Sequence, residues 1–178
     1  PWVLQAKNES ENKKRVALLF DLNTMSNEMA RAFRKLQKAQ TSNGGFWWFE
    51  GGPDDWYITQ HITSGFGHLD KLGVIKTREN NEAWSMLYKA VQYCDDRMRE
   101  EYDWMKKHNK NYLKENHLSY MAIQYLYMRS FFADIELEKR NKEHVAYYKK
   151  QEQTYWTGNS RYMQGMMALT LHRDKDVK

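Results

Sequence analysis

The sequence predicts an all-α protein of about seven helices, and three observations support this fold class. Glycine and proline nearly vanish outside residues 44–73, so the rest of the chain carries few helix breakers. Apolar residues recur there at intervals of three and four positions, the spacing of one helix face. No stretch alternates apolar and polar residues as a strand does. The 178 residues are expected to form a single helical domain, 1–178, with a buried core.

Two helices are expected before the glycine-rich segment. The first is indicated by the apolar residues Val16, Leu19 and Phe20. Ser26 suits the N-cap of the second, because its hydroxyl can accept a hydrogen bond from a free backbone amide. The helical stripe of this second helix is Met29, Phe33, Leu36 and Gln40.

A third and a fourth helix are predicted from their start and stop signals. Asp54 or Asp55 can cap the third helix and complement its dipole, and Gly73 can end it. Its expected apolar face is Ile58, Ile62, Gly65, Phe66, Leu69 and Leu72. The fourth helix is predicted to begin at Asn80 or Asn81. Its stripe is Trp84, Leu87, Tyr88, Val91, Met98, Tyr102 and Met105.

The remainder of the chain carries three further helical patterns. A polar break at residues 106–117 precedes a fifth stripe of Leu118, Met121, Ala122, Tyr125, Met128 and Phe132. The region 135–153 has fewer anchors, namely Ile135, Leu137, Val145 and Tyr148. The last pattern lies in "SRYMQGMMALTLHR", where helical spacing relates Met163, Met166, Met167 and Thr170.

Charge and composition exclude several classes of function. The net charge of +5 is mild, and the basic residues alternate with acidic and apolar ones, so no nucleic-acid partner is expected. No apolar run approaches the ~18 residues of a membrane span, so direct membrane insertion is not expected. The chain opens at Pro1 instead of methionine, and we therefore expect a fragment of a larger multidomain protein.

Candidate reactive groups are few. Cys94 continues the stripe of the fourth helix, so a small buried side chain is expected, and the two aspartates that follow oppose a thiolate. His61 and His68 are seven residues apart, which is not the i, i+4 spacing of a helical metal pair. Several acids of residues 95–103 are expected on the solvent face. The sequence predicts no metal site, no phosphate loop, no catalytic triad and no cofactor.

The segment "NGGFWWFEGGPDDW", residues 43–56, admits two interpretations. In the first it is a structural turn, in which two glycines permit a sharp helix-to-helix connection and aromatic rings fill the space between helix ends. The residues of this turn are Gln40, Gly44, Gly45, Phe46 and Trp47. In the second, tryptophans beside carboxylates form a carbohydrate site within residues 47–57. Its possible ligand contacts are Trp48, Glu50, Asp54, Asp55 and Trp56.

Several stretches of the chain together resemble one protein family. The pattern "Gln-x-x-x-Gly-Gly-Phe" at residues 40–46 resembles the turn that recurs in α/α-toroid proteins, where inner and outer helices alternate around a barrel. Five longer pieces are similar, in order, to the bacterial alpha-2-macroglobulin-like proteins, in the helical domain that holds the thioester in thioester-bearing members. These pieces are "PWVLQA", "LLFDLN", "LQKAQTSNGGFWWFEGG", "YITQHITSGFGHLDKLGV" and "YWTGNSRYMQGMMALTLHR".

This resemblance implies a protease-trapping inhibitor that is cleaved in a bait region and then holds the protease. The implied location is periplasmic, anchored to the cell envelope, or extracellular. The implied role of these residues is non-catalytic, with sister domains of the parent protein as partners and the target protease reached through the parent. The Cys-x-Glu-Gln thioester motif is absent and Cys94 does not match it, so no thioester residue is assigned.

The implied fold is a partial α/α toroid, a helical barrel of the kind found in terpenoid cyclases and protein prenyltransferases. A complete toroid of about a dozen helices needs more than this chain length, so the fragment is expected to self-associate through an open edge. The alternative function is a polysaccharide-active α/α-toroid enzyme or a carbohydrate-binding module. In the enzyme, Glu50 would pair with Asp54 or Asp55 as acid and base, and the stacking platforms would be Trp47, Trp48 and Trp56.

Overall fold

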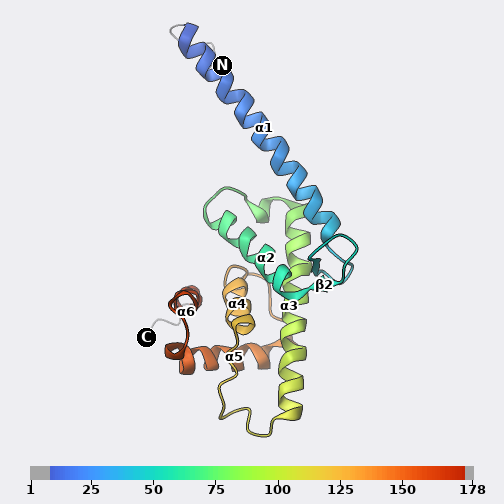
Figure 1. The fold of residues 1–178 in the computed structure, drawn as a ribbon, viewed down its shortest axis with the longest axis vertical. Helices are drawn as coiled ribbons and strands as arrows, with labels where there is room; N and C mark the ends of the chain where they lie inside the picture. Colours follow the sequence, from blue (N-terminus) through green and yellow to red (C-terminus); the bar gives the residue numbers. More distant parts are fainter. Residues whose placement is uncertain (1–8, 175–178) are drawn as a thin grey trace. The chain divides into compact units, whose positions relative to one another are not determined.

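The structure, a computed structural model, describes residues 9–174 and divides the chain into two compact units, residues 1–39 and 40–178 (Figure 1). The described residues form six α-helices and one two-stranded sheet. The predicted all-α class is confirmed. The sheet pairs β1 (Phe46–Trp47) antiparallel with β2 (Asp54–Asp55), and the expectation of no strand was wrong here. Strands of two residues are too short to show an alternating pattern.

The described part of the first unit is one helix, α1 (Glu9–Ala39), of 31 residues. The prediction of two helices with Ser26 as an N-cap was wrong, because Ser26 lies inside α1. No glycine or proline occurs between the two predicted stripes, so nothing interrupts the backbone hydrogen bonds there. Apolar side chains of α1 are between 41% and 68% exposed, among them Val16, Leu18, Leu19, Phe20, Leu22, Met25 and Met29.

Helix α2 (Trp56–Lys71) begins and ends at the predicted signals. The Asp55 carboxylate accepts a hydrogen bond from the backbone N–H of Ile58 at 2.8 Å, and Gly73 follows the helix with φ +70°. The predicted buried face was wrong apart from Phe66. The other buried residues are small or polar: Thr59, Gln60, Thr63, Ser64 and Gly67.

Close approach to a neighbouring segment explains why small residues of α2 face inward. A Cβ on Gly67 would lie 2.4 Å from Cγ of Phe131, which is closer than real Cβ contacts allow. The hydroxyl of Thr63 donates to the carbonyl of Thr59 at 2.7 Å, so its polar atom is satisfied within the helix. Burial of this face therefore does not require large apolar side chains.

Helix α3 (Asn81–His108) follows the short helix η2 (Thr77–Glu79) and is capped by Asn80, whose Oδ1 accepts from the backbone N–H of Ala83 at 3.0 Å. Most of its predicted stripe is buried, but Tyr88 is 47% exposed. Cys94 is buried as expected, and burial together with the Asp95 carboxylate raises the pKa of its thiol. Asp95 itself is fully buried, so the expected solvent face of residues 95–103 does not include it.

The C-terminal helices pack around α4. Ser119 caps α4 (Tyr120–Arg129), and Ser160 caps α6 (Arg161–Arg173). Between them lie η3 (Lys139–Asn141), α5 (Lys142–Tyr155) and η4 (Trp156–Gly158). Helix α4 is buried from Ala122 to Arg129, because other helices surround it.

Within residues 40–174 the helices fall into two alternating sets. Helices α2, α4 and α6 form one set, in which α4 packs against both of the others (Figure 1). Helix α3 packs against α2, α4 and α5, and α5 also packs against α4. Each successive helix therefore changes set, and within the first set α4 contacts both α2 and α6.

Candidate functional site

The loop between α1 and α2 is joined to α3 by the side chain of Gln40. Its Nε2 donates to the carbonyl of Gly44 at 3.0 Å and to the carbonyl of Met86, in α3, at 2.8 Å. The backbone N–H of Thr41 donates to the carbonyl of Gly45 at 2.8 Å and closes the turn. One amide group therefore fixes the turn and attaches it to a helix 46 residues further along the chain.

Both glycines of this turn lie where a side chain cannot fit. Gly44 has φ +95°, and a Cβ there would lie 2.4 Å from the carbonyl oxygen of Lys89. A Cβ on Gly45 would lie 2.7 Å from Cβ of Asp54 and 2.9 Å from the ring of Tyr93. The backbone thus approaches α3 and β2 closely, which only glycine allows here.

Phe46 is the apolar anchor of the loop. Its side chain is fully buried, and its backbone N–H donates to Oγ1 of Thr59 at 2.8 Å. Trp47 is half-buried and pairs with Asp54 in the two-stranded sheet. All five residues of the predicted turn therefore lie in one small joint between α2 and α3.

Two of the three predicted carboxylates have structural partners. Oδ2 of Asp54 accepts from the Tyr93 hydroxyl at 2.6 Å, and this hydrogen bond, followed by one from Asn43, holds the pKa of Asp54 below its ordinary value against the effect of burial. Asp55 caps α2. Glu50 is exposed. A carboxyl with a lowered pKa is a poor general acid, so Asp54 does not suit that role.

The tryptophans of the segment have different environments. Trp56 is half-buried, and its Nε1 has no hydrogen-bond partner among the described residues. Trp48 is 63% exposed, and its ring lies 6.3 Å from that of Tyr57 with an interplanar angle of 25°. The Tyr57 ring lies 6.1 Å from His61 and 6.4 Å from Tyr120.

These four side chains, Trp48, Tyr57, His61 and Tyr120, form an aromatic strip on the surface. Burial and the neighbouring hydroxyls of Tyr162 and Tyr57 raise the pKa of Tyr120. Sequence analysis missed His61 and Tyr120 as members. The four-residue spacing of Tyr57 and His61 on one helix could have indicated their contact. Tyr120 comes from α4, and no local pattern relates it to the loop.

The two histidines considered for metal binding lie in different surroundings. His61 belongs to the aromatic strip, whereas Nε2 of His68 lies 2.9 Å from the hydroxyl of Tyr127. Burial, and to a smaller extent Arg173, lowers the pKa of His68. Over residues 9–174, no group of three or more histidine, cysteine or carboxylate side chains is placed to hold a metal ion.

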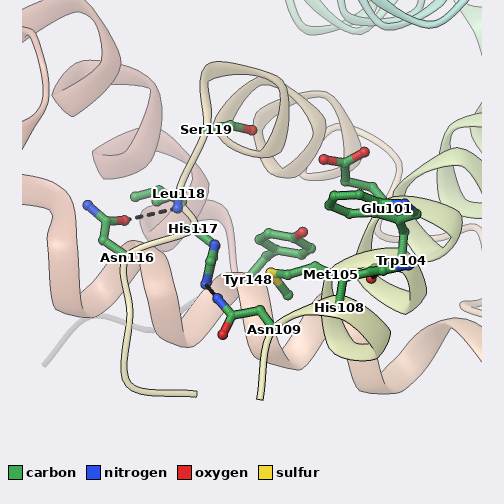
Figure 2. Close-up of a pocket in the computed structure, with 10 residues that line it drawn as sticks. All are labelled: Glu101, Trp104, Met105, His108, Asn109, Asn116, His117, Leu118, Ser119 and Tyr148. Carbon is green, nitrogen blue, oxygen red and sulfur yellow. Dashed lines mark hydrogen bonds between the residues drawn. The ribbon is translucent and has the colours of Figure 1, made fainter. Parts of the chain in front are cut away.

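A hollow of about 460 Å³ lies beyond the predicted site, at the C-terminal end of α3 (Figure 2). We call it the α3-end hollow. Its lining residues come from α3, from the loop before α4 and from α5: Glu101, Trp104, Met105, His108, Asn109, Asn116, His117, Leu118, Ser119 and Tyr148. Sequence analysis predicted no site here. It interpreted residues 106–117 as a polar break, several acids of residues 95–103 as solvent-facing, and Met105, Leu118 and Tyr148 as members of apolar stripes.

A second hollow, of about 690 Å³, lies beside Arg78 and Arg173. Arg78 is bound by two carboxylates, Asp70 at 2.6 Å and Asp134 at 2.9 Å, and these partners keep its pKa raised. The Arg173 guanidinium lies 3.8 Å above the ring centre of Phe131. Both arginines of this hollow are thus already engaged by the protein.

Comparisons of the chain with protein-family models, with curated proteins and with solved structures return no match. No helix in residues 9–174 combines the length and apolarity needed to cross a membrane. The comparisons therefore identify neither a family nor a function.

Proposed function

We propose that the chain is a non-catalytic helical module, part of an α/α toroid, of a bacterial alpha-2-macroglobulin-like protein that traps proteases at the cell envelope. The observation that carries the proposal is the alternation of helices between two sets. An α/α toroid requires inner helices that contact one another and outer helices that cover them, and α2, α4 and α6 have the contacts of an inner set.

The joint at Gln40 supports the same proposal. The turn that carries the Gln-x-x-x-Gly-Gly-Phe pattern is fixed to a helix, because the Gln40 amide binds both its own turn and the Met86 carbonyl of α3. Residues of the resembling turn thus form hydrogen bonds that hold the fold together. Asp54 and Asp55 are likewise used for packing and capping.

The test of this proposal uses the complete parent protein. It is mixed with a broad-specificity protease, and cleavage is followed on denaturing and native gels. We expect one discrete early cut, a more compact native species and retention of the protease. Scattered cleavage with the protease fully free would overturn the assignment.

A second candidate function, saccharide binding, is favoured by the aromatic strip. The Trp48 ring is largely exposed and nearly parallel to that of Tyr57, so a sugar ring could stack on this surface. Titration of the chain with oligosaccharides, followed by tryptophan fluorescence, tests it. Saturable quenching that Trp48→Ala removes and Trp104→Ala retains would favour the strip, and no quenching would exclude it.

The enzymatic form of this alternative depends on Glu50, because Asp54 and Asp55 are held by other groups. If the chain cleaves polysaccharide, Glu50→Gln should leave the fold intact and abolish turnover. A wild-type chain without turnover on a panel of polysaccharides would contradict the enzymatic form and leave the scaffold proposal standing.

A further inference from the structure

The α3-end hollow has three walls of different chemistry. One wall is the last two turns of α3, the opposite wall is the loop at residues 116–119, and Tyr148 of α5 lies between them (Figure 2). Its volume of about 460 Å³ falls within the usual range for small-ligand sites. The hollow therefore can accept a small molecule or one long side chain of a partner.

The charge of the hollow is negative. Glu101 is its carboxylate, and no ion pair of Glu101 occurs among the described residues. Its neighbour Glu100, by contrast, is paired with Arg97 at 2.7 Å. No lysine or arginine lines the hollow, and Lys106 of the same helix turn is bound to Glu143 at 2.5 Å. The C-terminal end of α3 adds the negative end of a helix dipole.

The aromatic surface of the hollow is available to a ligand. Trp104 is 63% exposed, and its ring lies against that of His108 at 4.6 Å with an interplanar angle of 30°. Tyr148 is almost fully buried, and burial together with the charge of Glu101 raises the pKa of its hydroxyl. A carboxylate beside an exposed indole is the arrangement that attracts organic cations.

Hydrogen bonds hold both histidines of the lining in place. Nδ1 of His108 lies 2.7 Å from the carbonyl oxygen of Trp104, so this nitrogen carries a proton and donates it to the carbonyl. On the opposite wall, Oδ1 of Asn109 accepts from the N–H of Asn111, which directs the amide nitrogen toward Nε2 of His117 at 3.3 Å. The lining is therefore held in place by the protein's own hydrogen bonds.

We propose that the α3-end hollow binds an organic ammonium group. The exposed face of Trp104 covers the cation, and Glu101 supplies the opposite charge. The site is separate from the joint at Gln40 and from the aromatic strip, so it does not depend on the proposed function.

The test compares choline with its neutral carbon isostere, 3,3-dimethylbutan-1-ol, by calorimetric titration of the full chain. The two probes have nearly the same shape and differ in charge. We expect saturable binding of choline and at least roughly tenfold weaker binding of the alcohol, since only the cation gains the charge and ring interactions. Equal binding of both probes, or binding of neither, would overturn the proposal.

Two variants and two matched controls locate the site. Glu101→Gln and Trp104→Ala should each weaken choline binding by roughly fivefold to tenfold. Trp48→Ala removes an equally exposed indole elsewhere, and Glu136→Gln removes an exposed carboxylate elsewhere, so both should bind as the wild type does. Circular dichroism confirms that each variant is folded. Unchanged binding in the first pair would overturn the assignment to this hollow.

Two further probes distinguish the source of the cation. Nα-acetyl-lysine methylamide presents the free ammonium of a lysine side chain, and its Nε-acetylated form lacks the charge. Binding of the first and not the second assigns the hollow to a lysine of a partner protein. Binding of choline alone assigns it to a small quaternary amine. Binding of the acetylated form as strongly as the free amine would contradict a cation site.

Discussion

At the scale of single residues, Glu152 is a buried carboxyl group in an environment that disfavours its ionised form. Its side chain is fully buried, and neither carboxylate oxygen has a hydrogen-bond partner among the described residues. Burial, with a smaller contribution from Asp174, raises the pKa of Glu152 to about 8. The folded protein therefore holds a proton that the unfolded chain, with an ordinary pKa of about 4.3, would release.

Because of this proton, the free energy of unfolding depends on pH. Because the folded pKa is the higher one, Glu152 stabilises the fold below its unfolded pKa, and that stability is lost as pH rises toward 8. At pH 8 we expect the free energy of unfolding of Glu152→Gln to exceed that of the wild type by on the order of 2 kcal/mol. Between pH 6.5 and 8 the free energy of unfolding of this variant should change little. Urea titrations across this range measure it. Glu136→Gln, an exposed control, should keep the wild-type slope.

Two glycines provide a matched pair of substitutions. At Gly45 a methyl group would lie 2.7 Å from Asp54 and 2.9 Å from the Tyr93 ring, whereas at Gly165, inside α6, nothing lies within 4 Å. Gly45→Ala should lower the free energy of unfolding by about 1–3 kcal/mol, since it forces the Asp54–Tyr93 hydrogen bond apart. Gly165→Ala should raise it by about 0.5–1 kcal/mol. Thermal melts that move in the same direction for both would contradict the structure.

At the scale of elements, helix termini were the best-predicted features. Caps depend on one residue and its next turn, so Asp55, Asn80 and Gly73 could be identified locally. The buried face of α2 could not, because it is set by close contact with Phe131, 64 positions beyond Gly67 in the chain. Only the packed structure shows that small and hydroxyl side chains, and not Ile58 or Ile62, face the core.

Substitutions at the N-cap of α2 test whether Asp55 has a structural role. Its carboxylate accepts one hydrogen bond, from the N–H of Ile58. Asp55→Ala should cost about 1 kcal/mol of stability, and Asp55→Asn should cost little, because the amide oxygen accepts the same bond. Denaturant midpoints of the two variants measure the difference. Equal losses would mean that the negative charge, and not the cap hydrogen bond, matters at this position.

At the scale of the whole molecule, the candidate sites divide by how they are assembled. The joint at Gln40 lies within a short segment, and its turn residues could be named from glycine and aromatic content. The aromatic strip needs Tyr120 of α4, and the α3-end hollow needs Tyr148 of α5. Both depend on packing between helices that are far apart in the sequence. The spacing of residues along one helix cannot predict such packing. Helical periodicity therefore predicts the elements but not the surfaces that they share.

The buried ion pair of Arg129 and Asp95 joins α4 to α3. Nε of Arg129, in α4, donates to Asp95, in α3, at 3.2 Å. Its other nitrogens donate to the carbonyls of Phe132 and Ile135, the latter at 2.6 Å. Tyr125 also donates to Asp95, at 2.6 Å. Burial raises the pKa of Asp95 to about 6, although Arg129 opposes the shift.

Removing one partner should therefore cost more than removing both. Arg129→Met leaves Asp95 buried without its cation and the carbonyl of Ile135 without its arginine donor, so we expect a loss of about 3–5 kcal/mol. Asp95→Asn combined with Arg129→Met should recover part of this loss, because no buried carboxylate remains. Urea unfolding of the four proteins in the cycle at pH 7.5 measures the coupling. Additive losses would show that the two side chains act independently and that the pair does not join α3 to α4.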